Sequence, residues 1–200
     1  MPNMRLYFSL LLFAIFHFSC ASFQSKPKNE TVILDKSEAR KAFEFLNLIR
    51  KNPGEFSERI GTDLNKITSS PSLVWNDILA KVAEEKAHDM ASRNYFAHVN
   101  PEKKGINFLI HSAGYKLIKD FRKSKRDNNF ESIQAGARNG EAAIIDLILD
   151  EGIPGKGHRN HLLAMGKWNK GLKDIGIGFV KSENSKYRTY TCIIIAKQDW

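Results

Sequence analysis

The chain has 200 residues, 42% of them hydrophobic and 26% charged, which is enough for one domain with a sizeable core. Its formal charge of +9 favours anionic partners such as phospholipid headgroups and cell-wall polymers. The only cysteines are Cys20 and Cys192, so a chain that loses its start on export has at most one pairable thiol and no internal disulfide.

The start of the chain has the pattern of a secretory signal peptide, which we assign to residues 1–20. One positive charge precedes residues 6–18, which are almost wholly apolar but too few to span a bilayer. Cys20 either lies at an ordinary cleavage site or becomes the lipidated first residue of a lipoprotein. Residues 21–36 are polar and predict a flexible tether, and residues 37–200 the folded domain. We therefore expect an exported protein, extracellular or in the cell envelope, either free or lipid-anchored.

Four segments have apolar residues at the helical period and are predicted to be helices: 37–52, 78–91, 106–113 and 140–149. Ser37 is expected to cap the first helix and Pro53 to end it. On the second helix, Lys86 is expected on the solvent side with the other charged residues. The predicted ends of the second and fourth helices place His98 and His158 in the loops that follow them.

The end of the chain changes to the period of a β-strand. Large apolar residues alternate with small ones over 175–179, and 187–196 is rich in β-branched and aromatic residues, with a turn at 182–185 between them. Helices followed by a hairpin predict an α+β domain in which helices pack on a small antiparallel sheet. Cys192 lies in the second predicted strand and is expected to be a buried, inert thiol.

Two histidines and nearby acids are the candidate functional residues. Imidazole is the commonest protein ligand for transition metals, so His98 and His158 with carboxylates such as Glu131 could form an open Zn²⁺ site. The same groups could equally form a hydrogen-bonded polar cluster without metal. The basic run Lys116–Arg126 has no nucleic-acid module around it and predicts a solvated loop, with docking on an anionic membrane as the alternative.

Several short motifs, in this order, resemble the CAP superfamily of cysteine-rich secretory proteins, antigen 5 and pathogenesis-related proteins. The resemblance covers residues 39–196 and rests on Leu48–Pro53, Leu73–Asn76, the loop around His98, the Glu131 segment, Gly157–Arg159 and Gly176–Gly178. It implies a three-layer α-β-α sandwich whose shallow cleft is lined by His98, Glu131, His158 and a second acid. Asp150 is favoured over Glu151 for that acid because it closes a predicted helix. Two residues depart from the family pattern at positions where asparagine is usual. Ser132 directly follows the glutamate, and His161 lies two positions after Gly-His-Arg.

From this resemblance and the exported start we expect a non-catalytic binding module for a lipid, a cell-wall component or a protein. We expect His98 and His158 to be the Zn²⁺ ligands if the cleft binds metal. We expect a monomer or weak dimer, peripheral membrane association as an option, and no nucleic-acid partner. The alternative is a Zn²⁺-dependent hydrolase in which Glu131 or Asp150 acts as general base.

Overall fold

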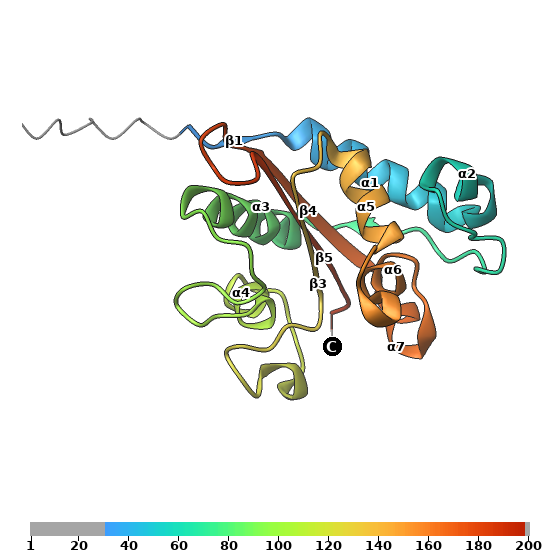
Figure 1. The fold of residues 1–200 in the computed structure, drawn as a ribbon. Coiled ribbons are helices and arrows are strands. Elements are labelled where there is room, and N and C mark those ends of the chain that lie inside the picture. Colours follow the sequence, from blue (N-terminus) through green and yellow to red (C-terminus); the bar gives the residue numbers. More distant parts are fainter. Residues whose placement is uncertain (1–30, 199–200) are drawn as a thin grey trace, which may run out of the picture.

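The computed structural model describes residues 31–198 as three layers, with helices on both faces of a central sheet (Figure 1). Three long strands form most of the sheet: β3 (Glu131–Ala135), β4 (Asp174–Lys181) and β5 (Thr189–Ala196). β5 lies between the other two and pairs antiparallel with both. The predicted α+β class and three-layer α-β-α sandwich are confirmed.

Two short strands and β3 were not predicted. β1 (Ile33–Leu34) pairs antiparallel with the outer edge of β4, and β2 (Val74–Trp75) pairs parallel with the start of β4. Both are only two residues long, so they carry no readable alternation. β3 is buried on both faces. It was not predicted because its polar residues Glu131, Ser132 and Gln134 interrupt the apolar pattern expected of a buried strand.

The predicted signal peptide, Cys20 and the first part of the predicted tether lie outside the described residues. The last part of the tether is structured, because β1 precedes residue 37 and α1 (Lys36–Lys51) already begins at Lys36. Asp35 caps α1, with its side chain accepting the N–H of Glu38 at 3.1 Å. The prediction that Ser37 is the cap is therefore wrong, since Ser37 lies within the first turn.

One face of the sheet is covered by α3 (Asp77–Ser92) and α4 (Ile106–Ser112). α3 begins where predicted because Asn76 accepts the N–H groups of both Ile78 and Leu79 at 3.1 Å. No helix among residues 31–198 is long and apolar enough to cross a membrane.

The packing of α3 on β4 is a backbone-to-backbone approach. A Cβ on Gly176 would lie 2.1 Å from the backbone nitrogen of Ala80, and a Cβ on Gly178 would lie 2.3 Å from the carbonyl oxygen of Ala83. Because side chains alternate along a strand, the larger residues between these glycines, such as Ile177, point to the opposite face. The alternation of large and small residues in β4 therefore reflects one helix lying directly on the strand.

The opposite face is covered by α1 and α5 (Gly140–Leu149), with a 3-10 helix η1 (Pro53–Phe56) and α2 (Ser57–Ile60) at one end. The buried Arg50 of α1 ties this layer to distant segments. Its guanidinium donates to the carbonyl oxygens of Pro71 at 3.1 Å and Leu162 at 2.8 Å. Burial lowers the pKa of Arg50 to about 10, which still leaves it charged at neutral pH.

Four short helical turns complete the fold: η2 (Lys119–Arg122), η3 (Pro154–Lys156), α6 (Gly157–Leu162) and α7 (Gly166–Lys170). His158 was predicted to lie in a loop but is the second residue of α6. The helix was missed because it is six residues long and lies between glycines, which normally indicate a turn. His98 does lie in the loop after α3, as predicted.

The α3–β4 approach generates a stability prediction. We expect Gly178→Ala to lower the free energy of unfolding by about 1–3 kcal/mol or more, because the added methyl must push α3 off the sheet. Gly157→Ala is the matched control, since its Cβ would meet no atom within 4 Å and its backbone is helical. Urea unfolding of both variants checks this, and equal stability of the two would show that the close contact does not exist.

Candidate functional site

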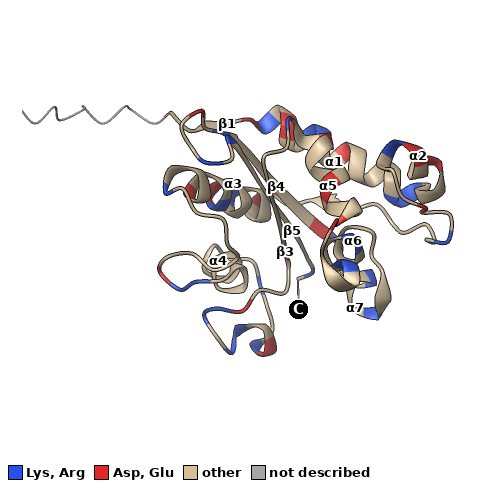
Figure 2. Cartoon of the chain, in the orientation of Figure 1, with Lys and Arg blue, Asp and Glu red and all other residues tan. Residues whose placement is uncertain are grey.

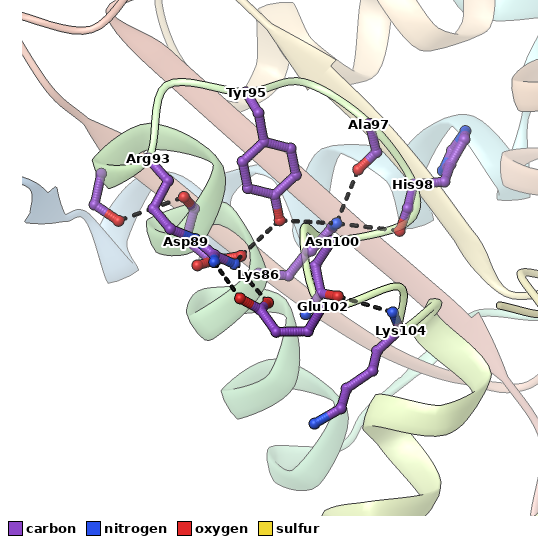
Figure 3. A network of polar contacts seen from close by, with 10 residues as sticks. Lys86, Asp89, Arg93, Tyr95, Ala97, His98, Asn100, Glu102 and Lys104 are labelled. Atoms are coloured by element: carbon purple, nitrogen blue, oxygen red, sulfur yellow. Dashed lines mark hydrogen bonds and ion pairs between the residues drawn. The ribbon is translucent and has the colours of Figure 1, made fainter. Parts of the chain in front are cut away.

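His98 is positioned by a buried lysine rather than by a regular element. Lys86 of α3 is only 2% exposed, and its Nζ donates to the carbonyl oxygens of Ala97 at 2.8 Å and His98 at 3.1 Å (Figure 3). A third hydrogen bond, of 3.2 Å, goes to the hydroxyl of Tyr95. The prediction that Lys86 faces solvent is wrong. Its spacing of four residues from both Val82 and Met90 in the apolar stripe is the signal that could have placed it inside.

A second polar cluster fixes the start of the same loop. Tyr95 donates its hydroxyl to Asp89 at 2.6 Å, and Arg93 bonds both Asp89 and Glu102 (Figure 3). Burial, together with the Asp89 carboxylate, raises the pKa of Tyr95, which stays a hydrogen-bond donor. The hydrogen bonds from Arg93 lower the pKa of Glu102 to about 2. The loop is thus held at its start, by Arg93 and Tyr95, and again at His98, by Lys86.

The ring of His98 meets Glu131 at the start of β3. Nδ1 of His98 lies 2.7 Å from Oε2 of Glu131, whose side chain is fully buried, whereas the His98 side chain is 42% exposed. The other carboxylate oxygen, Oε1, accepts from the thiol of Cys192 at 3.4 Å. Burial, and then the neighbouring Glu131 charge, raise the pKa of Cys192 well above its ordinary value, so it remains a thiol. Cys192 is free and buried, as predicted.

The ring of His158 forms a matching pair with Asp150. Nδ1 of His158 lies 2.7 Å from Oδ1 of Asp150, and Oδ2 accepts the backbone N–H of His158 at 2.9 Å and of Arg159 at 3.4 Å. Asp150 ends α5 in the left-handed conformation, at φ 49°, which turns its side chain back toward α6. Glu151 is exposed and makes no such bond.

Cations hold the beginning of α6 against the end of α5. Lys156 donates to the carbonyl oxygen of Asp150 at 2.8 Å, and Arg159 donates to those of Ile148 at 2.6 Å and Leu149 at 3.0 Å. These are among the last carbonyls of α5, which have no partner within the helix and carry the negative end of its dipole. These hydrogen bonds hold the start of α6 against the end of α5 and so keep His158 close to Asp150.

Ser132 and His161, the two departures from the family pattern, contact each other. The Ser132 hydroxyl lies 2.8 Å from Nδ1 of His161, and Nε2 of His161 lies 3.4 Å from the carbonyl oxygen of Ile195. Because a carbonyl only accepts, Nε2 carries the proton and Nδ1 accepts from the serine. Burial lowers the pKa of His161 to about 4, with smaller effects from His158 and Arg50, so the ring is neutral at pH 7. The pair joins α6 to β3 directly beside Glu131.

A hollow of about 420 Å³ opens where these elements meet. Its lining combines amides, imidazoles and acid with two apolar side chains: Asn128, Asn129, Glu131, Ser132, Ile153, Gly157, His158, His161, Trp168 and Asn169. Oδ1 of Asn128 is buried without a hydrogen-bond partner among the described residues. His98 and Asp150 are not lining residues, but each is bonded to one that is. No pattern in the sequence indicated that the asparagines or Trp168 would line the hollow.

The structure therefore joins the four predicted residues as two His–carboxylate pairs. A carboxylate only accepts, so each Nδ1 carries the proton that is donated to it. Neither Nε2 has a hydrogen bond within residues 31–198. Within the same residues, no group of three or more His, Cys, Asp and Glu side chains is arranged to hold a metal ion.

A larger hollow, of about 700 Å³, lies along α3 and α4 and contains none of these four residues. Its charged lining includes Arg93, Asp89 and Glu102, which are bonded to one another. The predicted site residues are thus associated with the smaller hollow and not with the larger one.

Comparisons with known proteins agree with this fold. The family model described as the cysteine-rich secretory protein family, CAP, matches residues 43–194. An extracellular SCP-domain protein from Bacillus anthracis is similar over 82% of this chain at 22% identity, with a TM-score of 0.50, and this chain spans 41% of that protein. An outer surface protein from Borrelia burgdorferi is similar over 85% of this chain and 99% of its own length, at 15% identity and a TM-score of 0.55. No curated protein sequence matches the chain significantly.

The buried neutral His161 generates a pH prediction. Its ordinary pKa is 6.5 and its pKa in the fold is about 4, so between these values the unfolded chain binds more protons. We expect this residue's contribution to stability to be complete above pH 6.5 and to fall by about 3 kcal/mol as the pH drops to 4. Urea unfolding at a series of pH values measures the slope.

The matched variant is the double substitution Ser132→Asn and His161→Asn, which places asparagines at both family positions and removes the titrating ring. Its stability should depend less steeply on pH over the same interval, while the carboxylates that both proteins share cancel in the comparison. Identical slopes for the two proteins would show that His161 is not buried as a neutral ring.

Proposed function

The chain belongs to the CAP family of cysteine-rich secretory proteins, and from this premise we propose that it is an exported, non-catalytic binding module. Its cleft takes a hydroxyl-bearing ligand of the cell envelope and, through His98 and His158, Zn²⁺. The signal-like pattern of residues 1–20 supports export. So do two structural relatives, one described as extracellular and one as an outer surface protein.

The observation that carries the non-catalytic assignment is that both carboxylates are already occupied. Glu131 accepts from the His98 ring and from the thiol of Cys192. Asp150 accepts from the ring and the backbone of His158. A carboxylate has about four acceptor positions, and those used here go to the imidazoles, to backbone N–H groups of α6 and to a thiol. This supports a role for the acids in orienting the imidazoles.

The donor set fits a metal held by two imidazoles. A metal-ligating histidine typically donates its other ring N–H to a carboxylate, which fixes the tautomer and makes the ring a better ligand. Both His98 and His158 have this arrangement. Two ligands leave coordination positions for water or for oxygen atoms of a bound ligand. Zn²⁺ would thus supply a Lewis-acid contact for the ligand, while Glu131 and Asp150 hold the rings.

The lining of the hollow supports a hydroxyl-bearing ligand over an acyl chain. Asn128, Asn129 and Asn169 contribute amide groups to its lining, and such groups can donate hydrogen bonds to ligand hydroxyls and accept from them. Trp168 and Ile153 supply an apolar wall for the ring or carbon skeleton between those hydroxyls. A sugar of the cell wall and a lipid headgroup share this chemistry.

Calorimetric titration of the purified protein with Zn²⁺ tests the metal site. We expect His98→Ala and His158→Ala each to remove most of the affinity. Glu131→Gln and Asp150→Asn keep both histidine ligands but remove the carboxylates that orient them. The affinity for Zn²⁺ should therefore fall about 10- to 100-fold. His88→Ala, on the exposed side of α3, is the control and should leave the titration unchanged.

Two outcomes would contradict the proposal. Unchanged Zn²⁺ affinity in both alanine variants at positions 98 and 158 would exclude the metal site. Turnover of a peptide or ester panel that disappears with EDTA and in Glu131→Gln would instead establish the hydrolase alternative, with Glu131 as the general base.

A further inference from the structure

Two segments at one end of the molecule are strongly basic. Residues 116–126 contain six Lys and Arg and one acid, Asp120, and residues 152–173 contain five Lys and Arg and no acid. Lys156 and Arg159 of the second segment face inward to α5, but Lys167, Lys170 and Lys173 are exposed. Figure 2 shows blue stretches in the loop below α4 and in α6 and α7.

Aromatic side chains join the two segments. Phe121 of η2 lies 5.0 Å from Trp168 of α7 between ring centroids, and both rings contact Phe130, at 5.3 and 5.8 Å. The loop that carries Phe121 is fixed from its other side, because Asn107 donates to the carbonyl oxygen of Phe121 and exchanges hydrogen bonds with Asn129. The basic run is therefore a solvated loop, as predicted, but one held at a defined place beside α7.

Apolar side chains are exposed in the same region. Trp168 is 42% exposed, Ile153 44% and Ile118 43%, three of the seven large hydrophobic side chains that the described residues leave exposed. Trp168 and Ile153 also form the apolar wall of the hollow beside His158. We call this region the basic–aromatic face and define it by Lys119, Lys123, Lys167 and Lys170 around Phe121 and Trp168.

We propose that the basic–aromatic face docks the domain on an anionic phospholipid membrane. Lys and Arg near such a surface are attracted by its negative potential, and tryptophan with aliphatic neighbours occupies the headgroup level, where one side is apolar and the other wet. A soluble anionic polymer would use the lysines but not the exposed Trp168, Ile153 and Ile118, which is why we favour the membrane. Two exposed acids reduce the positive charge of the region: Asp120, which pairs with Lys123 at 2.9 Å, and Glu151, two residues before Ile153. The lysines of both segments still outnumber them.

The proposal does not depend on Zn²⁺ or on a ligand in the cleft, so the two ideas can fail separately. It does predict the direction in which the cleft faces when the domain is bound to a membrane. Because Trp168 belongs both to the face and to the wall of the hollow, docking would turn the hollow toward the headgroups.

The test is co-sedimentation with vesicles of phosphatidylcholine alone or with about one third phosphatidylglycerol. We expect binding only to the anionic vesicles, with loss of binding as salt rises from about 0.05 to 0.5 M. Each basic residue near the surface contributes about a fivefold gain, so Lys167→Gln/Lys170→Gln and Lys119→Gln/Lys123→Gln should each weaken binding about 30-fold. Ile153→Ser should weaken it further without changing the charge.

The matched control is Lys51→Gln/Lys66→Gln, which removes two exposed positive charges near α2, outside both basic segments. It should bind almost as the unaltered protein does, and the N-terminal segment is common to every variant, so its own membrane affinity cancels. Equal losses in control and test variants would reduce the effect to net charge and overturn the proposal. Binding to soluble polyphosphate with no binding to anionic vesicles would overturn it in favour of a polymer.

Discussion

The rest of the structure depends on how closely α3 approaches β4. Gly176 and Gly178 let the backbone of the helix lie against the strand, at distances that any larger residue would prevent. This contact fixes the axis of α3 and therefore the side on which Lys86 is buried. From there Lys86 holds the carbonyls of Ala97 and His98, so the loop leaves the helix in one direction, over the sheet edge where Glu131 begins β3. A close helix–strand contact thus determines where one of the two imidazoles lies.

The second imidazole is placed by different means. Asp150 adopts a left-handed backbone at the end of α5, and one carboxylate then serves both the ring and the first backbone N–H groups of α6. Each ring is held through Nδ1 by an acid that is itself buried, which freezes its orientation at a small loss of side-chain entropy. Both Nε2 atoms remain as the reactive positions. The site is preorganised by carboxylates that act on the histidines.

The sequence indicated the helices, the hairpin and the candidate histidines because these depend on local periodicity or on motifs that can be read within a few residues. It failed where a position is decided by a partner far along the chain. Lys86 has a charged side chain in an apolar stripe, and only the loop carbonyls that it meets explain its burial. β3 has polar residues on a fully buried strand, because Ser132 bonds His161 and Glu131 bonds His98. Between Asp150 and Glu151 the end of the predicted helix did favour Asp150, although the left-handed backbone of that residue has no signal in the sequence.

The two departures from the family pattern have one physical explanation. Serine is shorter than asparagine and histidine is larger, and the short Ser132 on β3 meets the larger His161 on α6 at 2.8 Å. The hydrogen bond joins α6 to β3 through one buried, neutral ring. It also keeps Glu131 and His158 on neighbouring elements around the same hollow. Removing only one member would leave a buried polar atom of the other without this hydrogen bond, so the two positions are coupled.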